Sequence, residues 1–271
     1  MGKREVFAGI AIPVVVAAIV WLPAAAFLAL LGIAVVLAAD EMLAMARGAG
    51  IAVGRLIPLT MLAVVLVGSW RWGITGMAVS AIATVIVLPT AQLGHGRAPE
   101  GGLTGTAVGS LAVLYVGLCG ACLGWLRVLP DDDLGIRLLF FFLATIWVGD
   151  SGAYYVGRNL GRHKMAPRIS PNKTWEGLAG GVAGTVAGAA LARFLFVPDL
   201  GWPHVLALAA ILAVTAPVGD LVESQLKRDT GIKDSSTLLP GHGGFLDRTD
   251  SLLYSAPPVL VYLLASGLVT R

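Results

Sequence analysis

Long apolar segments, separated by short polar breaks, constrain the fold of this chain more than any other feature. A helix that crosses a lipid bilayer needs about 20 consecutive, mostly apolar residues, and about 17 at the short end. By that measure the sequence contains about nine crossing segments. They are residues 6–22, 24–42, 55–69, 72–90, 104–127, 135–157, 175–197, 202–222 and 250–270. Glycine, proline and charged residues fill the breaks, where helices are expected to end.

The composition excludes a soluble globular protein. Of the 271 residues, 57% are hydrophobic and only 13% are charged, whereas soluble domains carry roughly 25% charged residues. A soluble fold of this size could not bury so much apolar surface. We therefore expect an all-α, polytopic integral membrane protein.

The distribution of basic residues predicts the orientation of these segments. Cytoplasmic loops of membrane proteins are enriched in lysine and arginine. If the N-terminus lies in the cytoplasm, most of the 19 basic residues of this chain fall on the cytoplasmic side. The two long polar loops, residues 158–174 and 223–249, then lie on that side too. We expect a protein of the cell (cytoplasmic) membrane whose active site faces the nucleotides of the cytoplasm.

The two halves of the chain differ in the chemistry that they carry. Residues 1–130 are expected to form a scaffold of membrane helices, with dimer contacts as a further role, and residues 131–271 to form the catalytic part. Asp40 and Glu41 are acidic residues near the end of the second segment. They either face a cavity or mark an interfacial helix end, and the second interpretation is the simpler.

Two groups of polar residues flank the last polar loop with the same helical spacing. Spacings of i, i+3, i+4 and i+7 place side chains on one face of a helix. The first group is Asp220, Glu223, Ser224 and Lys227, and the second is Asp247, Asp250, Ser251 and Tyr254. The chain between them is long enough to turn back, so we expect the two faces to meet. Converging carboxylates repel each other unless a cation neutralises them, and oxygen ligands suit Mg²⁺ or Mn²⁺.

Basic residues and glycines surround these carboxylates. The bases are Lys227, Arg228, Lys233 and Arg248. Such side chains stabilise the charge of transferring and leaving phosphates while a metal ion bridges phosphate oxygens. Gly243 and Gly244 follow His242 and would let backbone amides approach a phosphate closely. His242 is either a general base or a structural hydrogen-bonding group. The combination predicts phosphoryl or nucleotidyl transfer.

A third polar group lies in the sixth segment. Asp150, Tyr154 and Arg158 are spaced four residues apart and share one helical face. A carboxylate inside a membrane helix is a functional hypothesis by default. The alternative is an internal ion pair of Asp150 with Arg158 or with a neighbouring residue.

The loop after that segment predicts an anion site. Arg168, Ser170 and Lys173 come directly before the seventh segment. Hydroxyl groups and a lysine at the start of a helix suit a phosphate or a lipid headgroup. Ordinary anchoring by positive charge is the alternative. In the seventh segment, glycines spaced four apart predict close packing against another helix.

One long pattern covers the last polar loop. It runs from Ser224-Gln-Leu-Lys227-Arg228 through Lys233-Asp234 to Pro240-Gly-His242-Gly243-Gly244-Phe-Leu-Asp247-Arg248-Thr-Asp250. This pattern resembles the signature of the phosphatidate cytidylyltransferase, or CDP-diacylglycerol synthase, family. Asp150, Tyr154 and residues 169–177 are similar to the family too, although some members carry lysine in place of Asn172. The resemblance covers about the C-terminal half, and the first five segments match only in hydropathy.

The resemblance implies a reaction and a set of roles. The enzyme would join phosphatidic acid and CTP into CDP-diacylglycerol and pyrophosphate, with Mg²⁺, as a homodimer of nine-span subunits. Asp220 and Asp247 match the metal-binding aspartates of the family. Our own mechanistic hypothesis adds Asp150, Glu223 and Asp250 as supporting carboxylates. Catalytic roles fall to Asp220, Asp247, Lys227, Arg228, Lys233, Arg248 and His242. Substrate-binding roles fall to Arg168, Ser170, Lys173, Ser224, Gly243, Gly244 and Tyr154. Mn²⁺ is an alternative metal, and a second, monovalent cation stays open.

Two other functions stay open at this point. Another CTP-using membrane lipid kinase or headgroup transferase would use the same carboxylates and bases. An ion-coupled transporter would also carry intramembrane acids, but transporters usually show inverted repeats with broken helices in both halves. Here the acids concentrate in one half and no repeat is visible. Membrane lipid is an expected partner and nucleic acid is not.

Overall fold

The computed structural model describes residues 13–93, 101–129, 132–236 and 243–269. These residues are almost entirely helical, and residues 13–21 form a first helical stretch. The helices that follow are α2 (Ala24–Gly48), α3 (Leu56–Leu93), α4 (Gly102–Leu111), the π-helical η1 (Ala112–Gly117), α5 (Leu118–Val128), α6 (Asp132–Leu160), α7 (Trp175–Phe196), α8 (Trp202–Asp229) and α9 (Leu246–Ala265). Two short strands, β1 (Lys164–Ala166) and β2 (Ser170–Thr174), lie between α6 and α7.

Six helices within the described ranges are long and apolar enough to cross a membrane. They are Ala24–Gly48, Leu56–Ala91, Gly102–Val128, Asp133–Leu160, Trp175–Phe196 and Trp202–Asp229. An all-α integral membrane protein is therefore confirmed. The number of spans and the side of the N-terminus stay predictions, because residues 6–12 of the first predicted segment lie outside the described residues.

Helix α3 is folded back on itself at Gly73. This residue has φ 63° and ψ −145°, a conformation open to glycine and strained for other residues. On either side of it, Gly68 and Gly76 touch so closely that a Cβ on Gly76 would overlap the carbonyl oxygen of Gly68. The two halves of α3 therefore pack side by side, and the turn falls next to the predicted break at residues 69–72.

The contact at Gly76 predicts a loss of stability on substitution. We expect Gly76→Ala to lower the melting temperature of the detergent-purified protein, since overpacking of this kind costs about 1–3 kcal/mol. Gly48→Ala is the matched control, because no atom lies within 4 Å of a Cβ placed there. Equal melting temperatures for the two variants would show that the halves of α3 do not meet at Gly76.

The chain divides into two compact units, and helices α8 and α9 run through both. The first unit contains residues 1–124 and 227–249. In it, α2 and α3 pack against α4 and η1. Gly117 of η1 lies against the side chain of Leu62, and Leu62, Val113 and Val116 are fully buried. The predicted division into a scaffold half and a catalytic half concerns roles and stays a prediction.

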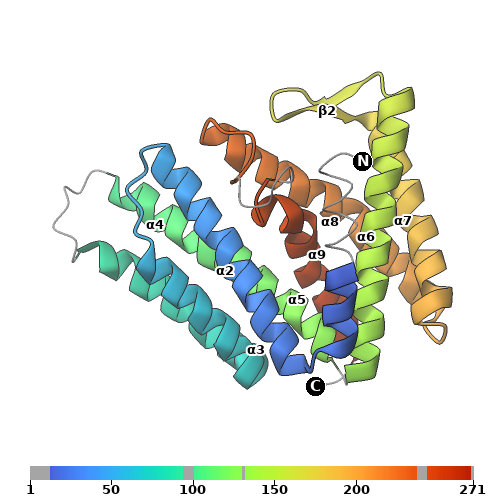
Figure 1. The fold of residues 1–271 in the computed structure, drawn as a ribbon, viewed down its shortest axis with the longest axis horizontal. Helices are drawn as coiled ribbons and strands as arrows, with labels where there is room; N and C mark the ends of the chain where they lie inside the picture. The colour runs from blue at the N-terminus through green and yellow to red at the C-terminus, as the bar shows by residue number, and fades with distance from the viewer. Residues whose placement is uncertain (1–12, 94–100, 130–131, 237–242, 270–271) are drawn as a thin grey trace. The chain divides into compact units, whose positions relative to one another are not determined.

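The second unit contains residues 125–226 and 250–271, and a glycine-lined seam joins its helices α6 and α7 (Figure 1). A Cβ on Gly152 of α6 would meet the carbonyl oxygen of Gly180 on α7, 2.5 Å away. Gly157 and Gly177 approach each other in the same way, with a Cβ on Gly157 lying 3.3 Å from the Cα of Gly177. The predicted packing role of the α7 glycines is confirmed.

The loop predicted at residues 158–174 contains a small antiparallel sheet, which the sequence did not indicate. Strands β1 and β2 pair through Lys164 with Thr174 and through Ala166 with Ser170. Thr174 is also the N-cap of α7, where its hydroxyl accepts a hydrogen bond from the N–H of Gly177 at 3.1 Å. The sheet therefore delivers Lys173 to a fixed place beside a helix N-terminus.

Candidate active site

In the second unit, the ion pair between Lys173 and Asp220 is the centre of a polar group. The Nζ atom of Lys173, from β2, lies 2.8 Å from Oδ2 of Asp220, from α8. The side chain of Lys173 is 22% exposed and that of Asp220 is 41% exposed. Ser224, one turn further along α8, donates to Oδ1 of Asp220 at 3.3 Å. The pair is thus ordered but still open to a ligand.

Asp150 belongs to the same group. It lies on α6 and interacts electrostatically with both Asp220 and Lys173. Two negative charges and one positive charge therefore gather from α6, β2 and α8. On the same face of α6, the Nη1 of Arg158 donates to the hydroxyl of Tyr154 at 2.9 Å. The predicted face of the sixth segment is present in the structure.

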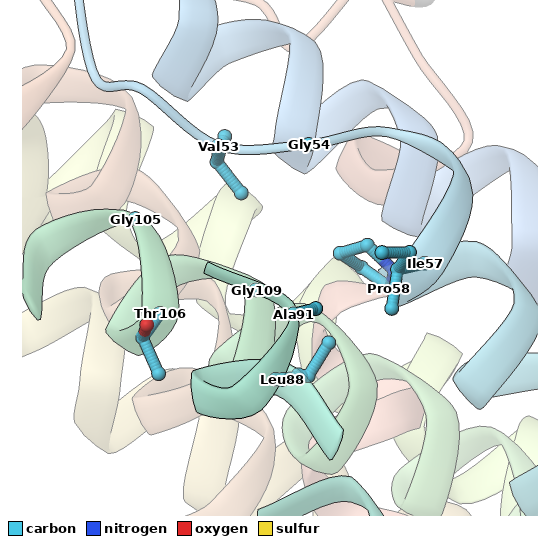
Figure 2. Close-up of a pocket in the computed structure, with 9 residues that line it drawn as sticks. All are labelled: Val53, Gly54, Ile57, Pro58, Leu88, Ala91, Gly105, Thr106 and Gly109. Atoms are coloured by element: carbon cyan, nitrogen blue, oxygen red, sulfur yellow. The ribbon is translucent and has the colours of Figure 1, made fainter. Parts of the chain in front are cut away.

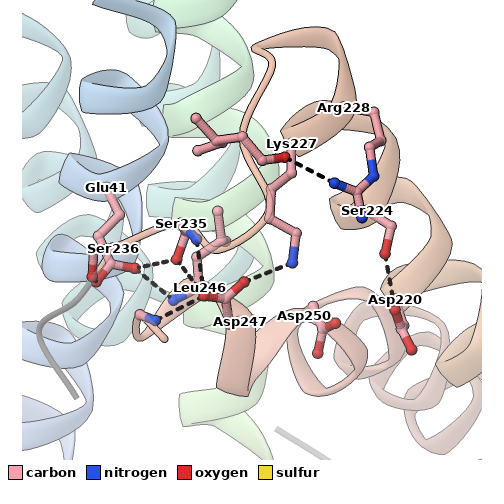
Figure 3. A network of polar contacts seen from close by, with 12 residues as sticks. Glu41, Asp220, Ser224, Lys227, Arg228, Ser235, Ser236, Leu246, Asp247 and Asp250 are labelled. Atoms are coloured by element: carbon pink, nitrogen blue, oxygen red, sulfur yellow. Dashed lines mark hydrogen bonds and ion pairs between the residues drawn. The ribbon is translucent and has the colours of Figure 1, made fainter. Parts of the chain in front are cut away.

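In the first unit, the carboxylate of Asp247 lies at the centre of a buried network (Figure 3). Its side chain is 4% exposed and its Oδ1 lies 2.7 Å from the Nζ of Lys227. Its Oδ2 accepts hydrogen bonds from the N–H of Ser235 at 2.9 Å, the hydroxyl of Ser235 at 2.9 Å and the N–H of Gly244 at 2.7 Å. The Lys227–Asp247 pair joins the end of α8 to the start of α9, where the sequence predicted that the chain turns back.

Glu41, from α2, occupies the other side of this network, and its interpretation as an interfacial helix end is wrong. Helix α2 continues to Gly48, and Glu41 is only 4% exposed. Its Oε1 accepts from the hydroxyl of Ser236 at 2.6 Å and the N–H of Phe245 at 3.0 Å. Its Oε2 accepts from the hydroxyl of Ser235 at 3.0 Å and the N–H of Leu246 at 2.9 Å.

One signal in the sequence could have identified Glu41. An acidic residue within an apolar helix is costly and usually functional, whichever half of the chain it belongs to. Its neighbour Asp40 behaves differently, because it pairs with Arg55 at 2.8 Å and with Arg47 at 3.8 Å. Asp40 does not mark a helix end either, because α2 continues to Gly48.

The other predicted residues are more dispersed. Glu223 is 1% exposed, and the carboxylate of Asp250 accepts from the N–H of Ser251 at 2.7 Å. Arg228 donates to the carbonyl oxygen of Ile232 at 3.2 Å. The exposed bases are Arg168, Arg228, Lys233 and Arg248, while Ser170 is half-buried. Gly243 has a positive φ of 77° and lies so close to Asp247 that a Cβ there would overlap the carboxylate. His242 lies outside the described residues.

The carboxylates of Asp150, Asp220 and Asp247 are not equally suited to bind a hard cation such as Mg²⁺. No group of three or more His, Cys, Asp or Glu side chains with metal-binding geometry occurs in the part of the chain that the structure describes. Both oxygens of Asp247 are already engaged by Lys227 or by hydrogen-bond donors. Both oxygens of Asp220 are engaged as well, by Lys173 and Ser224, but its side chain is 41% exposed and so more accessible to a ligand. Asp150 adds a second carboxylate. These two fit Mg²⁺, which takes oxygen ligands and usually keeps several waters.

A small cavity in the first unit lies apart from the predicted site residues (Figure 2). Its volume is about 20 Å³, which is room for one water-sized molecule. None of the predicted site residues lines it. The lining residues are Val53, Gly54, Ile57, Pro58, Leu88, Ala91, Gly105, Thr106 and Gly109. This cavity carries no group suited to phosphate chemistry.

Comparison with known families decides the relationship. The model of the cytidylyltransferase family matches residues 2–266, nearly the whole chain. The chain belongs to this family. The first five apolar segments, which resembled it only in hydropathy, are thus included in the match.

Several relatives carry the name phosphatidate cytidylyltransferase. The protein from Bacillus subtilis (strain 168) is 43% identical over 156 residues, which are 58% of this chain and 57% of the relative. The protein from Brucella suis biovar 1 (strain 1330) is 46% identical over 151 residues, 56% of this chain and 54% of the relative. The protein from Mycobacterium leprae (strain TN) is 48% identical over 132 residues, 48% of this chain and 41% of the relative. The matched stretch spans about half the length of each relative.

Proposed function

We propose that this cytidylyltransferase-family protein transfers the cytidylyl group of CTP to phosphatidic acid, giving CDP-diacylglycerol and pyrophosphate for phospholipid biosynthesis. The observation that carries the proposal is the Lys173–Asp220 ion pair beside Asp150, on the polar face at the end of α8. Carboxylates that bind a cation and a lysine that binds phosphate are the parts that such a transfer needs. The names of its relatives support the same reaction.

In the proposed reaction, a phosphate oxygen of phosphatidic acid forms a bond to the α-phosphorus of CTP. The bond from the α-phosphorus to the oxygen that bridges to the β-phosphorus breaks, and its electron pair leaves with pyrophosphate. The attacking oxygen is already anionic, so no general base is required. Catalysis then depends on orientation and on stabilisation of negative charge.

The residues of the second unit have three roles in this proposal. Lys173 moves from Asp220 to a substrate phosphate, since an ammonium group binds phosphate as a point charge. Asp220 and Asp150 would hold Mg²⁺ or Mn²⁺, and the bound ion would neutralise charge on the phosphates. The lipid phosphate or the nucleotide is bound by Arg168, Ser170, Ser224 and Tyr154, and the two carboxylates are supported by Glu223 and Asp250.

In the first unit, Lys227 and Asp247 form the rigid part of the proposed machinery. Lys227 is held by a buried carboxylate, so its position is fixed before substrate arrives. Gly244 presents its N–H to Asp247, which keeps the glycine-containing loop close to α9. The triphosphate is attracted, and pyrophosphate stabilised, by the exposed bases Arg228, Lys233 and Arg248.

The proposed membrane setting rests on three separate grounds. The charge distribution places the N-terminus and both polar loops on the cytoplasmic side. Hydropathy supports about nine crossings of the cell membrane, and the resemblance to the family supports a homodimer of two copies. CTP arrives from the cytoplasm and phosphatidic acid enters sideways from the lipid.

The proposal is tested with CTP that carries radioactive phosphorus. Purified protein with phosphatidic acid is expected to move label from the α-phosphate of CTP into the lipid, and EDTA is expected to stop the reaction until Mg²⁺ is restored. Label that moves from the γ-phosphate instead would identify a lipid kinase. Activity that is insensitive to EDTA would refute the metal role of Asp220 and Asp150.

A further inference from the structure

Glu41 is a buried acid that the proposed reaction does not use. We propose that Glu41 is a positioning residue for Asp247. Through Ser235 and the first N–H groups of α9, it holds Asp247, and with it Lys227, in the geometry that cytidylyl transfer needs. The inference rests on the proposed function for its kinetic part, while its structural part can be tested without any activity.

Ser235 links the two carboxylates directly (Figure 3). Its hydroxyl lies 3.0 Å from Oε2 of Glu41 and 2.9 Å from Oδ2 of Asp247. Its backbone N–H also donates to Asp247 at 2.9 Å. Because one hydroxyl proton lies between two carboxylate acceptors, a shift of Glu41 changes the bond that reaches Asp247. Ser235 is itself buried, so water does not readily replace the link.

The second link runs through the start of α9. The first N–H groups of a helix have no partner within it and attract negative charge. Glu41 accepts hydrogen bonds from the N–H groups of Phe245 and Leu246, at 3.0 and 2.9 Å. Asp247 is the next residue of the same turn. Fixing these two amides therefore fixes the backbone that carries Asp247.

Close packing leaves this arrangement little freedom. A Cβ on Gly244 would overlap both the hydroxyl oxygen of Ser235 and Oε2 of Glu41. Glu41, the Ser235 segment and the start of α9 are thus in contact without a gap. A network that is buried and satisfied in this way specifies one geometry.

Glutamine is the substitution that separates charge and hydrogen bonding from size. Each oxygen of Glu41 accepts from one backbone N–H, so a glutamine carboxamide in its place would point its NH₂ group at a donor in either orientation. Glu41→Gln therefore leaves one backbone N–H facing an NH₂ group instead of an acceptor, although the side chain keeps its volume. Asp40→Asn is the matched control on the same turn of α2, since Asp40 pairs with Arg55 and Arg47 instead.

The first measurement is steady-state kinetics with CTP and phosphatidic acid. We expect Glu41→Gln to lower kcat by about tenfold to a hundredfold, with KM for CTP changed by less than about threefold. Asp40→Asn should change neither by more than about twofold. A rise in KM at unchanged kcat would overturn the positioning role, because it would place Glu41 in substrate binding.

The second measurement is hydrogen–deuterium exchange of the peptide that contains residues 243–247. We expect faster exchange there in Glu41→Gln and unchanged exchange in Asp40→Asn. This readout holds even if the wild-type protein makes no CDP-diacylglycerol, so failure of the proposed function and failure of this inference are distinguishable. Unchanged exchange in Glu41→Gln would refute it.

A double-mutant cycle tests the route through Ser235. If Glu41 acts through Ser235, the effects of Glu41→Gln and Ser235→Ala on kcat are less than additive when combined. Asp40→Asn and Ser235→Ala should combine additively. Additive effects for the first pair would show that Glu41 does not act through Ser235.

Discussion

Replacing Lys227 by methionine is expected to abolish CDP-diacylglycerol synthesis and to destabilise the protein. Lys227 and Asp247 form an ion pair at 2.7 Å with side chains that are 12% and 4% exposed. Removing one partner of a buried pair leaves the other charge without compensation, which costs about 3–5 kcal/mol. The loss of a preorganised cation should lower activity by more than about a hundredfold.

Two comparison variants separate these effects. Lys227→Met combined with Asp247→Asn removes both charges, so it should recover much of the melting temperature but none of the activity. Lys173→Met breaks the more exposed pair with Asp220, where solvent screens the charges, and should cost little stability. A Lys227→Met variant with wild-type melting temperature and turnover would show that the buried pair has neither role.

Asp220→Asn is expected to remove activity while the fold stays intact. The substitution keeps the shape of a side chain that is 41% exposed, so the melting temperature should change by little. The variant loses a carboxylate suited to Mg²⁺ and the partner that orients Lys173, and we expect the rate to fall by more than about a hundredfold.

Asp199→Asn provides the control for a general effect of charge. Asp199 is an exposed residue of the same unit, in the connection between α7 and α8, and its replacement should leave synthesis unchanged. Both variants are assayed for label transfer from CTP to lipid, beside their melting curves. Substantial synthesis by Asp220→Asn would show that the metal assignment is wrong.

The helices could be predicted because hydropathy reports directly on contact with lipid. The turn in α3 at Gly73, the α6–α7 seam and the start of α7 at Thr174 all follow from local glycine and capping patterns. Helix lengths were less accurate. Helix α2 continues to Gly48 instead of ending at residue 42, because hydropathy detects the apolar span and not the helical turns beyond it.

The parts that were missed depend on contacts that no local pattern contains. Strands β1 and β2 are only 3 and 5 residues long, and Pro171 interrupts any alternation of polar and apolar residues. The role of Glu41 was missed because its partners lie far along the chain. Lys227 and Asp247 were predicted as separate site residues, and only the structure shows them as a buried pair.

The distance along the chain between Glu41 and its partners has a consequence for how the protein is made. Glu41 and Phe245 are separated by 204 positions. During synthesis, α2 enters the membrane long before α9 exists. The carboxylate of Glu41 therefore lacks, at first, the backbone N–H groups that later donate hydrogen bonds to it. An unsatisfied acid in lipid is costly, so the first unit gains its full stability only when the last helix arrives. A chain that stops before residue 245 would therefore leave Glu41 without these hydrogen bonds, and we expect cellular quality control to degrade it.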